Sequence, residues 1–134
     1  MIKFFIADNL SPDAKHQFTV KQALLHYQKL PYTVIIAPKE SQKSITDILE
    51  GLWPKRAILV TPKPTKGCLC VTDQLIGQNP AAELCIINTN SSLMIEQKNC
   101  KVLIEIIYEN RDAGREKYKH HMQSGNKPDV EHIK

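Results

Sequence analysis

Short apolar runs rich in β-branched residues recur along the chain, as in strands that are buried within a parallel sheet. They predict strands over Ile2–Ala7, Thr33–Ala37, Ala57–Val60, Cys68–Val71, Leu84–Ile87 and Lys101–Tyr108. Apolar residues at helical spacing predict helices over His16–Lys29 and Ser41–Trp53. Because strands and helices alternate through the first half of the chain, the pattern indicates the α/β class.

The length of the chain limits the number of domains. Its 134 residues are enough for one hydrophobic core and too few for two comfortable domains. We therefore predict a single α/β domain over residues 1–125, with a mostly parallel sheet flanked by helices. Gly125 and Pro128 are expected to end the last helix, and the polar residues Asp129–Lys134 to form a loose C-terminal tail within residues 126–134.

One side of the predicted last helix carries positive charge around an aromatic ring. Arg111, Arg115, Tyr118, Lys119 and Met122 follow one another at spacings that place them on one side of a helix. A guanidinium can hold a carboxylate through two parallel hydrogen bonds, and a ring beside it can cover an apolar side chain. This side suits an acidic peptide with an apolar end, although solvated charges that only keep a helix soluble would give the same pattern.

A second basic stretch lies between Gly51 and Thr72, where the sequence contains no Asp or Glu. It carries four basic residues and the only tryptophan of the chain, namely Lys55, Arg56, Lys63, Lys66 and Trp53. This surface is the basis of an alternative function, in which a small basic module binds single-stranded nucleic acid directly and Trp53 stacks on a base. The net charge of only +4 does not favour that alternative.

The usual sequence patterns of catalysis and cofactor binding are missing. The glycines form neither G-x-G-x-x-G nor G-x-x-x-x-G-K-S/T, and no serine lies in G-x-S-x-G. Cys68 and Cys70 lack the second pair of ligands that a zinc site usually has. We therefore expect a non-catalytic protein without cofactor or metal. The alternative, a small enzyme with Cys68 or Cys70 as nucleophile, predicts a thiol of unusual reactivity.

The sequence also bears on the compartment. No apolar run approaches the roughly 20 residues needed to cross a bilayer. The first apolar run ends at Asp8 rather than at a small-residue cleavage site. The four cysteines fit the reduced thiols of a cytosolic protein. We therefore expect a cytoplasmic protein that does not bind membranes.

The order of these motifs resembles the chi subunit of bacterial DNA polymerase III, an accessory protein of the clamp-loader complex. In that family a helix leads to a Leu-Trp pair, a short strand ends in proline, another closes on asparagine, and an apolar run with a central Glu precedes an Arg-Glu-Arg-Tyr-like helix. The corresponding segments here are Leu52-Trp53, Leu59–Pro62, Cys85–Asn88, Ile104–Ile107 and Arg115–Lys119 with the downstream Gly125. The sequence departs from the family at Ile48-Leu49, where Leu-Asp is frequent, and at Lys63, where histidine is frequent.

The resemblance implies a mononucleotide-binding-like α/β fold without a nucleotide site. It implies a non-catalytic accessory subunit of the polymerase III holoenzyme that binds the acidic, phenylalanine-ended C-terminal tail of single-stranded DNA-binding protein. The tail-binding residues carry over to Arg115, Tyr118 and Lys119, with Arg111 and Ile107 as neighbours.

The resemblance implies a second partner as well. In many bacteria the chi subunit binds the psi subunit, and through it the clamp loader. The contact region carries over to Trp53 and Val60, and the aromatic residue that is usual at the position of Val60 is absent. Contact with nucleic acid would then be mainly indirect.

Overall fold

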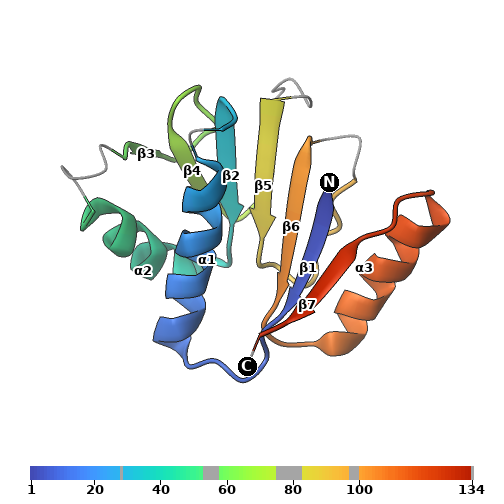
Figure 1. Ribbon diagram of the computed structural model, residues 1–134. Coiled ribbons are helices and arrows are strands. Elements are labelled where there is room, and N and C mark those ends of the chain that lie inside the picture. The colour runs from blue at the N-terminus through green and yellow to red at the C-terminus, as the bar shows by residue number, and fades with distance from the viewer. Residues whose placement is uncertain (28, 53–57, 75–82, 97–99, 134) are drawn as a thin grey trace.

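The computed structural model describes residues 1–27, 29–52, 58–74, 83–96 and 100–133. Within these residues, seven strands form one parallel sheet that is combined with three helices (Figure 1). The strands are β1 (Ile2–Ile6), β2 (Tyr32–Ile36), β3 (Val60–Thr61), β4 (Leu69–Thr72), β5 (Leu84–Asn88), β6 (Val102–Ile107) and β7 (Asp129–His132). The helices are α1 (Pro12–His26), α2 (Lys39–Glu50) and α3 (Arg111–Gln123). The predicted α/β class and parallel sheet are confirmed.

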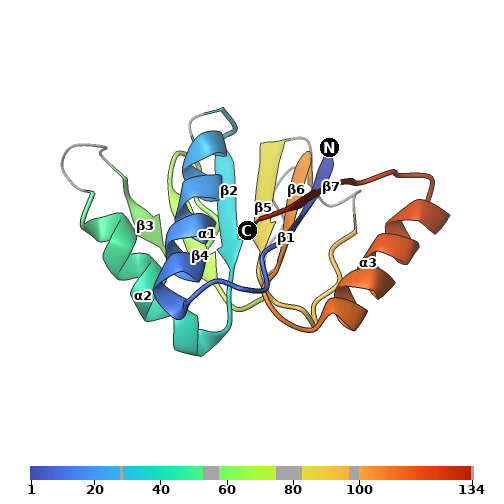
Figure 2. The same cartoon turned by 60° about the horizontal axis from the view of Figure 1, so that its bottom comes forward.

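The sheet brings the two ends of the chain together. Its strand order is β3-β4-β2-β5-β6-β1-β7, so the first strand lies between β6 and the last strand. Figures 1 and 2 show α1 and α2 grouped at one side of the molecule and α3 at the other side. No helix of the described residues has the length and apolar composition that a membrane span requires.

Successive residues of a strand point to opposite faces of the sheet, and both faces are covered. On one face, Phe5 packs edge-on against Phe18 of α1, with ring centroids 5.1 Å apart. On the other face, Phe4 packs edge-on against Tyr118 of α3, with centroids 6.0 Å apart. The adjacent phenylalanines of β1 therefore anchor helices on both faces.

Two helices begin earlier than the apolar spacing predicts. Helix α1 begins at Pro12 rather than His16, because the Ser11 hydroxyl accepts a hydrogen bond from the Ala14 amide, 3.2 Å away, and caps the helix there. Helix α2 begins directly after Pro38. These first turns carry polar residues, so the hydrophobic pattern does not mark them.

The prediction of a loose tail was wrong for Asp129–His132, which form strand β7. This strand pairs with β1 in parallel, and the Ile133 amide donates to the Ile6 carbonyl at 2.8 Å. Gly125, at φ +86°, turns the chain back from α3 toward the sheet edge. All four side chains of β7 are exposed, so backbone hydrogen bonds rather than an apolar pattern hold this strand.

A buried ion pair fastens α3 to the sheet. The Lys117 Nζ of α3 lies 3.0 Å from Glu105 Oε1 of β6, and the two side chains are 3% and 0% exposed. Lys117 also donates to the Asn90 carbonyl at 2.8 Å, and Asn88 Nδ2 donates to Glu105 Oε2 at 3.3 Å. Burial raises the pKa of the Glu105 carboxyl to about 7, although the Lys117 charge and the hydrogen bonds from Lys117 and Asn88 to this carboxyl oppose the rise. The pair therefore fixes α3 at one position on β6.

At pH 8, above the pKa of Glu105, we expect Lys117→Met to lower the free energy of unfolding by about 3–5 kcal/mol, because it leaves the Glu105 carboxylate buried without its counter-charge. Urea denaturation measures this change. Adding Glu105→Leu to Lys117→Met should restore most of the loss, since no buried charge then remains. A double variant as unstable as the single one would contradict this role for the pair.

The raised pKa of Glu105 gives stability a specific pH dependence. Between about pH 4.5 and pH 7 the folded protein holds a proton on Glu105 that the unfolded chain has released, so this group stabilises less as pH rises. Relative to Glu105→Gln, the wild type should lose up to about 3 kcal/mol across that range, at about 1.4 kcal/mol per pKa unit. Urea denaturation of both proteins at several pH values measures the difference, and a constant difference would contradict the assignment.

Candidate functional site

An open cavity of about 240 Å³ lies between α3 and the two strands at one end of the sheet, β1 and β7. Helix α3 contributes four of its lining residues, and each strand contributes two. These residues are Arg111, Gly114, Arg115, Tyr118, Phe4, Ile6, Val130 and His132. The cavity therefore joins parts of the chain that lie near its beginning and its end.

The floor and one wall of the cavity are apolar. Phe4 is buried, and the Tyr118 ring stands edge-on against it. Across from the helix, Val130 of β7 leaves 46% of its surface exposed, which is high for a branched apolar side chain. An apolar group that entered the cavity would cover this surface.

Gly114 allows α3 to approach the sheet closely at this point. A Cβ atom on Gly114 would lie 3.2 Å from Cγ1 of Ile107, closer than packed side chains normally come. Ile107 itself is only 2% exposed and lies beneath Gly114. It therefore supports the helix that carries the cavity and is not among the residues that line it.

The two arginines of the cavity keep free hydrogen-bonding capacity. Arg111 Nε pairs with the Asp8 carboxylate, and this hydrogen bond is the main cause that lowers the pKa of Asp8. Arg115 Nη1 lies 3.0 Å from Asp112 Oδ1 in a pair that is exposed on both sides. A guanidinium has five N–H donors, and exposed pairs of this kind are weak. Both arginines can therefore still bind an incoming carboxylate.

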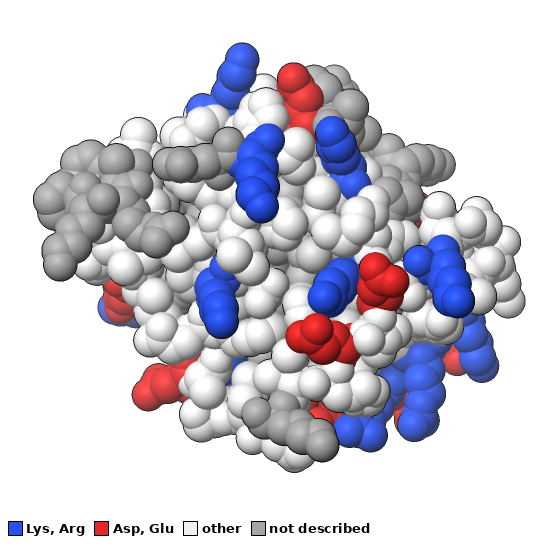
Figure 3. Space-filling view, in the orientation of Figure 1, with Lys and Arg blue, Asp and Glu red and all other residues white. Residues whose placement is uncertain are grey.

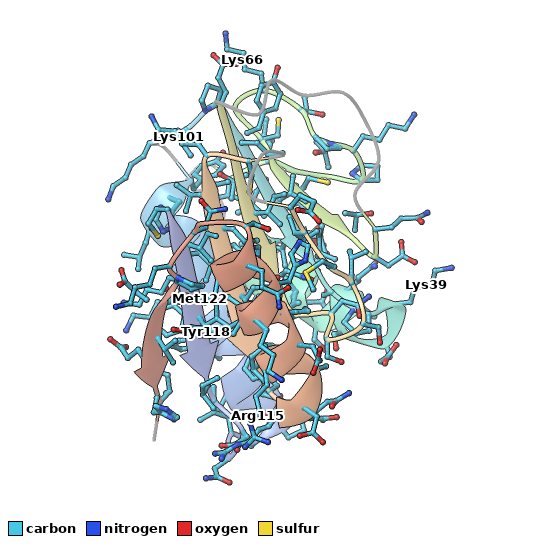
Figure 4. All side chains as sticks on the ribbon, turned by 90° about the vertical axis from the view of Figure 1, so that its right-hand side faces the viewer. Lys39, Lys66, Lys101, Arg115, Tyr118 and Met122 are labelled. Atoms are coloured by element: carbon cyan, nitrogen blue, oxygen red, sulfur yellow. The ribbon has the colours of Figure 1, made fainter. Side chains whose placement is uncertain are left out.

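The structure brings together three of the predicted site residues, Arg111, Arg115 and Tyr118. Lys119 is exposed beside the cavity, 3.8 Å from Glu116, and does not line it. Met122 is 44% exposed, and Figure 4 shows it beyond Tyr118 along α3. Figure 3 shows Lys and Arg side chains gathered at the lower right, where α3 lies. The positive side predicted for this helix thus borders the cavity.

The second basic surface is only partly placed. Trp53, Lys55 and Arg56 lie outside the described residues. Val60 is half-buried in β3, at the far end of the sheet from β7, and Lys63 and Lys66 are exposed in the loop that follows. The predicted contacts of Trp53 and Val60 with a psi-like partner therefore stay predictions.

The cysteines of the described residues are reduced, and three of the four are buried. Burial raises the pKa of the Cys70 thiol to about 11, so this thiol is protonated at neutral pH and a poor nucleophile. Cys68, the residue directly before β4, is half-buried. No group of three or more potential metal ligands occurs in the part of the chain that the structure describes.

A larger cavity of about 420 Å³ opens between α1 and α2; its Lys15 and Tyr108 side chains are already paired, whereas the buried Nδ1 of His16 has no hydrogen-bond partner. The Tyr108 hydroxyl donates to the Lys15 carbonyl at 2.6 Å, and Lys15 Nζ lies 3.1 Å from Glu109 Oε1. A second carboxylate, that of Glu40, also lines this cavity. This balance of charges favours no particular ligand, whereas the cavity beside α3 combines two arginines with an apolar floor.

Five of the residues that line the cavity were not identified from the sequence, although some of them carry a sequence signal of their position in the fold. Phe4 and Phe5 are adjacent in a strand, which already indicates that both faces of β1 are covered. Gly114 inside a helical pattern is a sign of close packing. Val130 and His132 carried no usable signal, because the polar sequence around them hides β7. The apolar pattern predicts Ile6 as part of the first strand and indicates no role for it in a binding site.

Comparison of the sequence with protein-family models and with curated proteins found no match. A function for this cavity is therefore argued from the residues that line it and from the motifs of the sequence.

We expect Gly114→Val to lower the free energy of unfolding by about 1–3 kcal/mol, because its side chain must displace Ile107 or lift α3 from the sheet. Thermal or urea denaturation measures the loss. Glu116→Val, at an exposed position of the same helix, controls for the effect of a β-branched residue on helix stability. Equal losses in the two variants would show that close packing at Gly114 is unimportant.

Proposed function

We propose that this protein is a non-catalytic accessory subunit of the bacterial DNA polymerase III holoenzyme that binds the acidic C-terminal tail of single-stranded DNA-binding protein. The observation that carries this proposal is the cavity beside α3, in which two arginines border an apolar floor. The resemblance of the sequence to chi subunits supplies the partner, and the cavity has the chemistry that such a tail requires.

The cavity fits the end of an acidic peptide that closes on an aromatic residue. An apolar cavity of about 150 Å³ can already hold a benzene ring. The 240 Å³ beside α3 leaves room for a ring and for the carboxylate next to it. The ring would lie against Phe4, Tyr118 and Val130, and the terminal carboxylate would take two parallel hydrogen bonds from Arg115.

Charge and apolar contact have separate roles in this proposal. Exposed ion pairs contribute only about 0.2–1 kcal/mol each, so Arg111 and Lys119 mainly attract and orient the acidic residues of the tail. Burial of the terminal ring supplies most of the affinity, at roughly 25 cal/mol for each Å² of apolar surface removed from water. Binding should therefore weaken as salt is added, without vanishing.

In this proposal Ile107 does not contact the tail. The resemblance makes Ile107 a neighbour of the tail-binding residues. Because Ile107 lies buried beneath Gly114, we now assign it to the support of α3 and assign the wall to Val130.

We expect a labelled acidic peptide that ends in phenylalanine to bind the purified protein, and Arg115→Ala to weaken this binding about tenfold or more. Lys119→Ala should weaken it less than about fivefold, because Lys119 borders the cavity without lining it. Fluorescence anisotropy measures both affinities. The same peptide without its final phenylalanine should bind far more weakly than the intact peptide.

Lys66→Ala is a matched control, because Lys66 is an exposed lysine that Figure 4 shows far from Arg115. Its affinity for the peptide should equal that of the wild type. Loss of single-stranded DNA binding in Lys66→Ala, together with no peptide binding by any variant, would instead favour direct nucleic-acid binding through the second basic surface.

A further inference from the structure

The strand that the sequence did not predict places a histidine in the cavity. His132 is the last residue of β7, opposite Ile6 of β1 in the parallel register, and it lines the cavity with Arg111 and Arg115. The hydrogen bond from the following residue, Ile133, to the Ile6 carbonyl fixes this end of the strand. The histidine is therefore held at the cavity by backbone pairing rather than carried on a loose tail.

The two arginines of the cavity are each partly neutralised. Arg111 is paired with Asp8, and Arg115 with Asp112. His132 lies close enough to the Asp8 carboxylate that its positive charge, when present, helps to lower the pKa of Asp8, after the larger effect of Arg111. A positive charge on His132 would therefore make the net charge of the groups around the cavity more positive.

The other charged groups near His132 belong to residue types that ordinarily keep their charge between about pH 5.5 and pH 8. They are Arg111 and Arg115 of α3 and the Asp8 carboxylate after β1, whose pKa is lowered mainly by the hydrogen bond from Arg111. On its own strand, Glu131 pairs with Lys3 of β1 at 3.6 Å. A histidine side chain is the group that ordinarily changes charge in this range.

We propose that His132 is a third cationic group of the peptide site, so that the protein binds an acidic peptide more tightly when this imidazole is protonated. Protonated His132 would attract an acidic residue of the bound peptide and also compete with Arg111 for the Asp8 carboxylate. More of the Arg111 guanidinium then becomes available to the peptide. This inference rests on the proposed function and adds regulation by pH to it.

The test is a titration of the labelled phenylalanine-ended acidic peptide at pH 8.0 and pH 5.5, at constant ionic strength. Wild type should bind roughly two- to fivefold more tightly at the lower pH, the range expected for one exposed ion pair. His132→Gln should bind at both pH values as the wild type does at pH 8.0. His132→Lys, with a fixed charge, should bind at both as the wild type does at pH 5.5.

His26→Gln is the control, because His26 lies at the end of α1 and does not line the cavity. It should keep the full pH dependence of the wild type. Equal pH dependence in the wild type and His132→Gln would overturn the inference and leave the proposed function standing. Absence of peptide binding by the wild type at both pH values would overturn the proposed function itself.

Discussion

The position of α3 depends on one buried ion pair, between Lys117 and Glu105. An ammonium and a carboxylate lose several kcal/mol each when they leave water, so the folded state tolerates them only where each finds its partner. Lys117 pairs with Glu105 and donates a hydrogen bond to the Asn90 carbonyl, and Glu105 also accepts a hydrogen bond from Asn88. A shift of α3 along β6 would separate these groups at a high cost. Apolar packing alone resists such sliding much less, since one apolar contact readily replaces another.

The cavity follows from this placement. With Lys117 fixed on one side of α3, the helix turns Arg111, Gly114, Arg115 and Tyr118 toward β1 and β7. Gly114 lets the helix come close to Ile107, so Tyr118 reaches the Phe4 ring. The last strand then closes the open side with Val130 and His132. A structural charge pair inside the protein thus sets where the exposed charges of the same helix can act.

The sequence predicted most of the fold and part of the site, for reasons that particular residues make clear. Buried parallel strands such as β2 and β5 are almost wholly apolar and are easily recognised. The spacing of Arg111, Arg115 and Tyr118 predicted their shared side, because helical periodicity is a local property. Strand β7 and the Lys117–Glu105 pair could not be predicted in this way. Edge pairing is made by the backbone, and an ion pair between residues of distant elements depends on tertiary packing.

The central claim is that acidic peptides bind between α3 and β7. Nuclear magnetic resonance of the uniformly ¹⁵N-labelled protein, titrated with the phenylalanine-ended peptide, tests it most directly. We predict that amide shifts change at Gly114 and Tyr118, along Phe4–Ile6 and at Val130–His132, while Lys63–Gly67 stay unchanged. Shift changes confined to Lys63–Gly67, or none at saturating peptide, would contradict the claim.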